Sequence, residues 1–386
     1  MLCTNTLVLN GINVNQPTSK NTILVAGHLC LDIIPDLSLG GSLDDLKPGS
    51  LSMIGPVETA TGGVVANTGL ALYRLGQSVR LVAKVGDDEF GKLIYNKFEA
   101  VESGLGDSLI LDSASHTSYT VVLDFPEQDR HFLHHPGAND TLLNRDIPDS
   151  AFTDADLIHF GYPPLLASMV ANDGKELISL FRRVKSAGMV SSLDMAWVDP
   201  SSNAGQVDWP AVLKNILPHI DIFMPSIEEI SFMLGETMPS TTLDVEYLRR
   251  ISQRLLDYGA GIVVLKLGEF GLYLRSSSEM SQLESLERLG QSPQDWTDLE
   301  IIQPCFKVEE KGSTGAGDSA IAGFLAALCR GSEPEFCLQM AAAVGACKVE
   351  AHDALSGLRT WDDTQQRIDA GWPLSENRVI REEITQ

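Results

Sequence analysis

Basic residues are scarce in this sequence of 386 residues. Lys and Arg total 28 against 52 for Asp plus Glu, which gives a formal net charge of −24 at pH 7. Binding to nucleic-acid phosphates needs clusters of Lys and Arg, and the nearest approach to one is Arg182, Arg183 and Lys185. We therefore expect no nucleic-acid partner. An acidic protein can still bind a small polyanion through backbone N–H groups, a helix N-terminus and a metal ion.

Long apolar runs and paired cysteines are also missing. No window approaches the ~18 consecutive apolar residues of a membrane-spanning helix, and residues 1–21 lack the basic start and apolar stretch of a signal peptide. The six cysteines are scattered, with no C-x-x-C pair. These absences predict a cytoplasmic protein with reduced thiols, no membrane partner, and a loose N-terminal extension over 1–21.

Short apolar strands alternate with amphipathic helices along most of the chain. Strands are expected at 22–26, 79–85, 157–160, 189–193, 220–224 and 262–267, and helices at 64–75, 89–102, 175–187, 227–234 and 245–258. Apolar strands between amphipathic helices indicate a mostly parallel sheet covered on both faces. We predict one α/β domain over 22–370 and a C-terminal tail over 371–386.

Three segments break this alternation. Residues 33–61 are rich in Gly, Pro and Ser, and residues 118–135 alternate between apolar and polar side chains like an antiparallel strand pair. Together they predict a small β-sheet lid, because loops after strands commonly cover α/β sites. Residues 276–300 are rich in Ser, Gln and Glu and predict a polar surface insertion.

The sharpest motif is the run Lys311-Gly-Ser-Thr-Gly-Ala-Gly-Asp318, which leads directly into an apolar helix-forming segment. Small residues before a helix let backbone N–H groups point at an anion, and the helix dipole adds about half a positive charge there. The run therefore predicts an anion hole beside the carboxylate of Asp318. The alternative is that Asp318 only provides a favourable charge at the helix N-terminus.

Two further stretches place glycine or acid beside a strand end. Gly62 and Gly63 open the helix that carries Asn67, and Asp32 follows the first strand by five residues. A glycine pair can simply mark the turn between strand and helix. Alternatively it lets the backbone approach a ligand, with Asn67 offering a donor and an acceptor to hydroxyl groups.

Taken together, these stretches resemble the PfkB, or ribokinase-like, family of carbohydrate and nucleoside kinases from about 23 to 354. The most specific element is the run Gly315-Ala316-Gly317-Asp318 feeding the helix. Supporting elements, in family order, are the glycine pair with Asn67 and the runs at 86–91, 136–139 and 267–271. The resemblance implies a three-layer αβα fold with a mostly parallel central sheet and a small β-sheet lid.

The resemblance also implies site roles. Asp318 matches the catalytic base that takes the proton from the acceptor hydroxyl during transfer of the γ-phosphate of ATP, and Gly315, Ala316 and Gly317 match the anion hole. Positions that hold the substrate hydroxyls are matched by Asp32, Gly62, Gly63 and Asn67. Nucleotide-binding positions are matched by Lys266, Gly268, Gly271, Ser226, Glu229 and Ser313, with Glu229 organising Mg²⁺ through water.

Three departures from the family pattern bear on function. Gly312 stands where the family usually has Asp, Ser226 replaces the Asn of an Asn-x-x-Glu motif, and Lys266 replaces a common Thr. One interpretation is that Lys266 or Lys311 takes over charge neutralisation from a metal. The other is a catalytically weakened or silent protein that binds sugar or nucleoside.

The expected activity is phosphorylation of a hydroxyl group of a small sugar, sugar acid or nucleoside. We expect this hydroxyl to belong to a hydroxymethyl group. The resemblance also implies a possible homodimer through the lid. Cys30 stands where ribokinases place a polar contact, which argues against ribose itself. A nicotinamide dehydrogenase is a weaker hypothesis, because its G-x-G-x-x-G should follow the first strand and that stretch lacks it.

Other constellations stay open. Asp194, at the end of a strand, is either a site group or a loop cap. A histidine cluster lies in the alternating segment, at His131, His134 and His135. Neighbouring residues there point to opposite faces, which disfavours a metal site. The alternative is that one of these histidines, or Arg130, faces the ligand from the lid. The acidic run 87–89 is expected to cap the following helix.

Overall fold

A computed structural model describes residues 21–38, 42, 47–125, 131–238 and 243–376. Its central sheet has eight strands in the order β14-β13-β12-β11-β10-β9-β1-β4. The six strands from β4 to β12 pair in parallel, whereas β13 runs antiparallel to both of its neighbours, β12 and the edge strand β14. The strands are β1 (Thr22–Gly27), β4 (Ser78–Val82), β9 (Leu157–Gly161), β10 (Val190–Leu193), β11 (Ile222–Phe223), β12 (Ile262–Lys266), β13 (Leu272–Ser276) and β14 (Glu300–Gln303).

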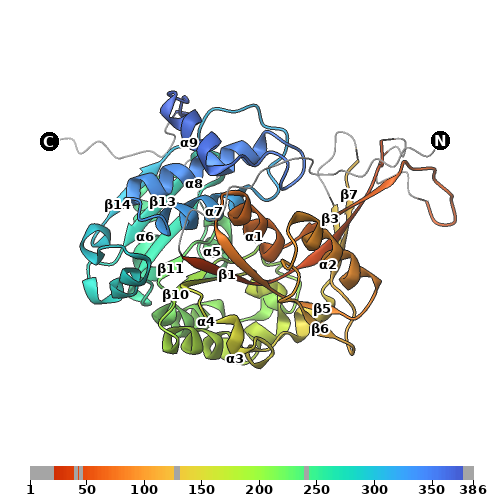
Figure 1. The fold of residues 1–386 in the computed structure, drawn as a ribbon, viewed down its shortest axis with the longest axis horizontal. Helices are drawn as coiled ribbons and strands as arrows, with labels where there is room; N and C mark the ends of the chain where they lie inside the picture. Colours follow the sequence, from red (N-terminus) through yellow and green to blue (C-terminus); the bar gives the residue numbers. More distant parts are fainter. Residues whose placement is uncertain (1–20, 39–41, 43–46, 126–130, 239–242, 377–386) are drawn as a thin grey trace.

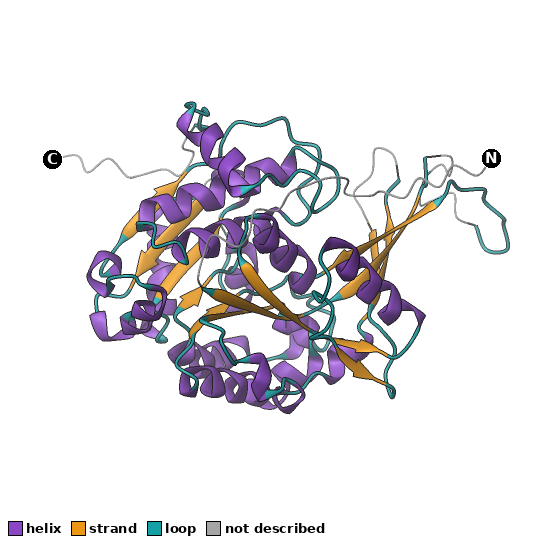
Figure 2. Cartoon of the chain, in the orientation of Figure 1, coloured by secondary structure: helices purple, strands orange, loops and turns teal. Residues whose placement is uncertain are grey.

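Helices cover both faces of this sheet, as Figures 1 and 2 show. One apolar cluster joins the sheet to α1 (Val64–Arg74), α2 (Glu89–Val101), α7 (Ala316–Leu328), α8 (Pro334–Val349) and α9 (Trp361–Asp369). A second cluster joins the other face to α3 (Ala167–Ser186), α4 (Trp209–Ile216), α5 (Ile227–Met233) and α6 (Val245–Asp257). The predicted three-layer α/β architecture is confirmed.

The sequence explains the deepest helix pair. Nearly every residue of α7 is small or apolar, and from Asp318 to Leu328 all are buried. Gly323 lies against α8, because a Cβ added there would come within 2.7 Å of the Met340 carbonyl. This close packing holds the N-terminus of α7 in a fixed position above the carboxyl ends of the parallel strands.

A second sheet projects from the main body, to the right in Figure 1. It has the order β3-β2-β7-β8, from β2 (Cys30–Pro35), β3 (Val57–Gly62), β7 (Tyr119–Leu123) and β8 (His131–His135). The two regions predicted to form a lid, 33–61 and 118–135, therefore do share one sheet. Parts of both regions, residues 1–20 of the extension predicted over 1–21, and residues 377–386 of the predicted tail lie outside the described residues.

One predicted strand is wrong in its extent. The apolar run 79–85 was expected to be continuous, but it divides at Ala83 into β4 of the main sheet and β5 (Lys84–Gly86). The latter pairs instead with β6 (Ile110–Asp112) in a two-stranded sheet. The acidic run before α2 does act as a cap, since Asp88 accepts a hydrogen bond from the Gly91 N–H at 2.9 Å.

The segment over 276–300, predicted as a polar surface insertion, exposes many of its residues but is also anchored in the core. Its short 3₁₀ turns bury Leu283, Leu286, Leu289 and Trp296 against the α7 side of the core. Three-residue spacing of the leucines matches a 3₁₀ turn, and the polar residues between them hide the pattern. This segment closes one end of the sheet and does not contribute to the cavity described below.

Part of the predicted tail is likewise packed. Trp372 stacks on Phe306 with ring centroids 4.5 Å apart, and the backbone N–H of Lys307 donates to the Pro373 carbonyl at 2.8 Å. The chain from 371 to 376 is thus held against residues 305–308, which border the cavity. Within the residues described, no helix is long and apolar enough to cross a membrane.

Candidate active site

The N-terminus of α7 forms the centre of the site. Gly315 caps it with φ +78°, a left-handed conformation that glycine adopts without steric cost. The Ala316 N–H donates to the Ser313 carbonyl at 3.0 Å, whereas the Gly317 N–H belongs to the first helical turn, where amides have no partner within the helix. Amides and helix dipole together make this turn suited to an anion.

Asp318 lies in the same turn and is 3% exposed. Its Oδ2 accepts a hydrogen bond from Asn67 Nδ2 at 3.0 Å, and its Oδ1 accepts one from Thr68 Oγ1 at 3.2 Å. Burial raises the pKa of Asp318, while Lys266 and the hydrogen bonds oppose that rise. The carboxylate is therefore held in one orientation and poised to accept a proton.

Tyr162 is a site residue that the sequence did not indicate. Its hydroxyl donates toward both oxygens of Asp318, at 2.9 and 2.8 Å. The residue follows β9 and has φ +64° and ψ +42°, a conformation that costs a non-glycine residue about 1–3 kcal/mol and is often found at functional sites. The only local signal was its place at the carboxyl end of a strand, before Pro163 and Pro164.

Beside Asp318 lies a buried cluster of charges. Lys266 Nζ is 2.6 Å from Asp194 Oδ1, with 12% and 1% of their side chains exposed. Burial works against the charged form of Lys266, but Asp194, Glu229 and Asp318 outweigh it and raise the Lys266 pKa. Asp194 is thus a site group, and one lysine faces three carboxylates.

Lys266 also borders the anion-binding turn. A Cβ built on Gly317 would lie 3.6 Å from Lys266 Nζ. The backbone of Lys266 is fixed by its N–H, which donates to the Pro225 carbonyl at 3.0 Å, next to Ser226. The ammonium therefore stands where a bound phosphate group would meet both it and the first amides of α7.

Ser226 and Glu229 form a capping box at the start of α5. The Glu229 N–H donates to Ser226 Oγ at 3.2 Å, and the Ser226 N–H donates to Glu229 Oε2 at 2.8 Å. One carboxylate oxygen of Glu229 is thereby used by the helix, and the other remains for the cavity. Serine in place of asparagine still orients this glutamate, because either residue can cap a helix.

A cavity of about 970 Å³ opens from Asp318 along α7 and α8. Its lining includes all of the residues expected to bind nucleotide together with the anion-binding turn: Lys266, Gly268, Gly271, Ser226, Glu229, Ser313, Gly315, Ala316 and Gly317. Its apolar lining includes Leu272, Phe306, Val308, Ala341, Ala342, Ala346 and Val349. The cavity thus combines anion-binding groups with apolar surface.

The residues expected to hold a substrate hydroxyl lie on the other side of Asp318. A Cβ built on Gly62 would lie 2.4 Å from Asp32 Oδ2, so only glycine fits beside this carboxylate. Burial raises the pKa of Asp32 to about 6, although hydrogen bonds with Cys30 and Thr120 oppose the rise. Asn67 connects Asp318 to Gly63, whose carbonyl accepts from the Asn67 N–H at 2.8 Å, while its own Oδ1 is buried without a partner among the described residues.

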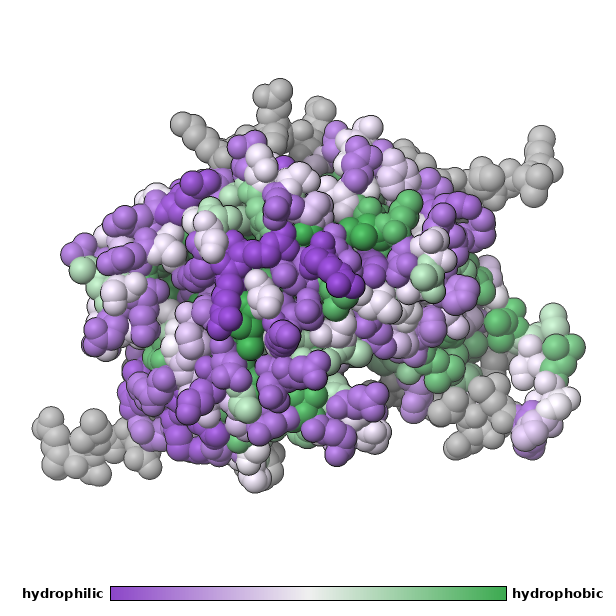
Figure 3. Space-filling view, turned by 90° about the horizontal axis from the view of Figure 1, so that it is seen from below, coloured by the Kyte–Doolittle hydropathy of each residue, from purple (hydrophilic) through white to green (hydrophobic). Residues whose placement is uncertain are grey.

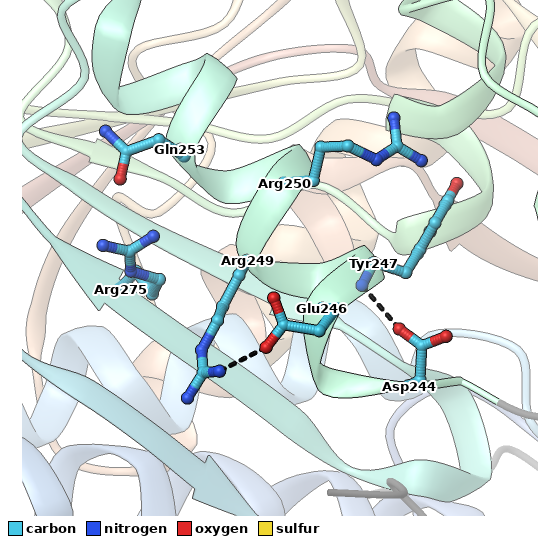
Figure 4. A pocket seen from close by; sticks show the side chains of 7 residues that line it. All are labelled: Asp244, Glu246, Tyr247, Arg249, Arg250, Gln253 and Arg275. Carbon is cyan, nitrogen blue, oxygen red and sulfur yellow. Dashed lines mark hydrogen bonds and ion pairs between the residues drawn. The ribbon is translucent and has the colours of Figure 1, made fainter. Parts of the chain in front are cut away.

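A second hollow, of about 580 Å³, lies over α6 and β13 (Figure 4). Two of the arginines that line it form surface ion pairs: Arg249 contacts Glu246 and Glu300, and Arg250 contacts Glu236. It contains none of the residues expected at the site. The chemistry therefore belongs to the cavity at α7.

Comparison with known proteins agrees with this geometry. The model of the pfkB family carbohydrate kinases matches residues 21–361. An uncharacterized sugar kinase of Archaeoglobus fulgidus is 25% identical over 292 residues, which is 75% of this chain and 98% of that protein. The 2-dehydro-3-deoxygluconokinase of Bacillus subtilis is 24% identical over 317 residues, covering 81% and 87% of the two chains.

Solved structures share the fold. Arabidopsis thaliana ribokinase complexed with ribose and ATP superposes with a TM-score of 0.70 at 22% identity, over 90% of this chain and 98% of that one. A fructokinase with bound ATP from Xylella fastidiosa gives 0.68 at 20% identity, over 91% and 99%. With the family model matched over most of its length, this chain belongs to the pfkB family of carbohydrate kinases.

Proposed function

We propose that this enzyme transfers the γ-phosphoryl group of ATP to a hydroxyl, such as a hydroxymethyl group, of a small sugar, sugar acid or nucleoside. The observation that carries the proposal is the position of Asp318. It lies in the anion-binding turn of α7 and lines a large cavity, and Asn67 connects it to the glycine pair, since its side chain donates to Asp318 and its backbone N–H donates to the Gly63 carbonyl. A base is thus located between two binding regions.

ATP fits the cavity in one direction. The adenine would lie against the apolar surface at Ala341, Ala342 and Ala346, and the phosphates would reach Lys266 and the first amides of α7. Ribokinase and fructokinase relatives of known structure, at low identity, have been described with ATP. In this arrangement the overall charge of −24 is no obstacle, because the phosphates meet local positive charge.

Asp318 then acts as the general base. Its carboxylate takes the proton of the acceptor hydroxyl as the oxygen forms a bond to the γ-phosphorus, and the bond from that phosphorus to the ADP oxygen breaks. The proton remains on Asp318 until it leaves with product or solvent. Charge on the phosphoryl oxygens is stabilised by the amides of the turn and by Lys266, the main contribution to such a transfer.

Mg²⁺ fits this site as a companion of the nucleotide. Asp194, Glu229 and Asp318 place three carboxyl groups beside Lys266, burial raises the pKa of Asp194 to about 8, and Asp194 Oδ2 is buried without a partner among the described residues. No group of three metal ligands occurs in the described part of the chain. That suits Mg²⁺, which keeps several waters and binds through one or two carboxylates plus substrate phosphates. When bound, it would neutralise charge on the phosphates.

Release of ADP over a panel of sugars, sugar acids and nucleosides tests the proposal. We expect acceptor-dependent release in the wild type and a loss of about 100-fold or more in Asp318→Asn, since base catalysis contributes roughly 10²–10⁴-fold. Wild-type turnover in Asp318→Asn would refute the assigned base. The second candidate, a silent binding protein, is favoured by Gly312 and Ser226 and would show sugar or ATP binding by calorimetry without turnover.

We also propose that the enzyme forms a homodimer through the second sheet. Large apolar side chains are exposed there, including Val57 at 53%, Phe132 at 56% and Leu133 at 58%. Apolar colour gathers at that end of the molecule in Figure 3. A second copy would cover this surface, and light scattering on Leu133→Asp should then give a monomer mass.

A further inference from the structure

His28 is a buried imidazole whose hydrogen-bonding capacity is unused. It follows β1 and is 3% exposed, and neither Nδ1 nor Nε2 has a partner among the described residues. A buried polar group left unpaired costs about 1–3 kcal/mol, so nearly all such groups in folded proteins find a partner. The imidazole therefore requires an explanation.

The backbone holds His28 rigidly at the glycine pair. Its N–H donates to the Gly161 carbonyl at 3.4 Å, and its carbonyl accepts from the Val65 N–H, the second amide of α1, at 3.2 Å. A Cβ built on Gly63 would lie 2.4 Å from His28 Nδ1, just as one on Gly62 would lie 2.4 Å from Asp32 Oδ2. The two side chains thus approach neighbouring glycines.

The ring also has neighbours on both sides of the site. Its centroid lies 6.0 Å from that of Tyr162, whose hydroxyl contacts Asp318, and 5.3 Å from that of His134 on β8 of the second sheet. His28 is therefore located between the base and the lid. This is the region where an acceptor hydroxyl must lie if Asp318 is to receive its proton.

The charge state of His28 selects among ligands. Burial, with a smaller contribution from His134, lowers the His28 pKa to about 3, so the ring is neutral at physiological pH. A neutral imidazole has one donor and one acceptor nitrogen, which suits hydroxyl groups because each of them both donates and accepts. Asp32, with a pKa of about 6, carries negative charge nearby and disfavours an anionic acceptor.

We propose that His28 binds a hydroxyl group of the acceptor and, with Asp32, selects a neutral polyhydroxylated sugar over a sugar acid. This inference rests on the proposed kinase function and narrows its acceptor class. His28 does not take part in proton transfer to the base. It is a specificity residue that binds a second hydroxyl group, close to the one whose proton Asp318 accepts.

The test pairs a variant with deoxy analogues of the acceptor. His28→Leu keeps a side chain of comparable size without polar atoms, and His28→Asn keeps one donor and one acceptor. For the best neutral sugar we expect kcat/KM to fall about 10- to 100-fold in His28→Leu, as for the loss of a hydrogen bond to a polar site group, with the KM for ATP unchanged. His28→Asn should recover part of the loss.

One deoxy analogue should identify the hydroxyl that His28 binds. In the wild type its kcat/KM should also fall about 10- to 100-fold, and in His28→Leu it should equal that of the parent sugar, because the lost interaction is the same one. The proposal would be overturned if each deoxy analogue lowered kcat/KM by the same factor in the wild type and in His28→Leu. A merely structural role of His28 predicts this result, because the effects of the substitution and of the missing hydroxyl would then be additive. Preference of the wild type for sugar acids over neutral sugars would also overturn the proposal.

Failure of the kinase function can be distinguished from failure of this inference. If no acceptor releases ADP, calorimetry with the neutral sugars replaces turnover, and binding to the wild type that His28→Leu loses would support the role of His28. Absence of binding to the wild type would overturn it. If His28→Leu does not fold, as judged by thermal unfolding, the comparison is made with His28→Asn. Because asparagine keeps a donor and an acceptor, this variant must then still prefer the parent sugar to the deoxy analogue.

Discussion

Removing the hydroxyl of Tyr162 should change the pH at which the enzyme becomes active. The hydroxyl donates to both oxygens of Asp318, and its own pKa is raised well above the usual range by burial and by Asp318, so it remains a donor. Hydrogen bonds to a charged group contribute about 1.5–3 kcal/mol. At 1.36 kcal/mol per pKa unit, Tyr162→Phe should raise the Asp318 pKa by about one to two units.

The sign follows from the role of the base. Asp318 must be ionised to accept a proton, so activity is lost as the pH falls through its pKa. The acid limb of kcat/KM against pH should therefore move up by about one to two units in Tyr162→Phe, while rates well above the new pKa change little. Steady-state rates of ADP release between pH 5 and 9 would measure this.

A matched control is available on the surface. Tyr73 donates to Glu102 at 2.7 Å in an exposed contact far from the cavity, and Tyr73→Phe should leave the profile unchanged. A Tyr162→Phe profile that superimposes on the wild type, with normal thermal stability, would refute the argument that this hydroxyl stabilises the ionised base. A uniform fall at every pH would point to a positional role instead.

Three further predictions concern charge. Asp32→Asn should raise the free energy of unfolding by up to about 3 kcal/mol at pH 8, because a pKa raised from 3.8 to about 6 means that ionisation of Asp32 destabilises the fold. In denaturant titrations this gain in stability should vanish below pH 4. An equal gain at both pH values would contradict the prediction. Lys266→Met should raise the KM for ATP about tenfold or more and move the acid limb upward, since Lys266 lowers the Asp318 pKa; an unchanged KM would exclude a phosphate contact. Lys348 is fully buried and donates to the Gly312 carbonyl at 2.5 Å, so Lys348→Met should cost about 1.5–3 kcal/mol of stability by thermal unfolding, whereas exposed Lys92→Met should cost little.

Much of the site could be predicted because its chemistry is local in sequence. Gly315, Gly317 and Asp318 lie within one helical turn, and their spacing alone indicates an anion-binding turn with an acid beside it. Asn67 follows its glycine pair by one turn in the same way. Such motifs carry their geometry with them, because a helix fixes where each side chain points.

The residues that escaped prediction act through contacts between distant segments. Tyr162 contacts Asp318, and His28 lies against Gly63, only because the loops after β9 and β1 meet there. No periodicity in the sequence reports such a meeting. The same holds for Trp296, whose burial depends on where a largely polar segment folds back on the core.

The hydrogen bond between Asn67 and Asp318 joins residues 251 positions apart. Asn67 stands on α1 near the start of the chain, and Asp318 stands on α7 near its end, with the sheet assembled from the segments between them. Ribosomal synthesis therefore produces Asn67 long before Asp318, and the hydrogen bond between them can form only after the intervening strands have been made. The polar cluster around Asp318 is for this reason completed late as the chain is synthesised.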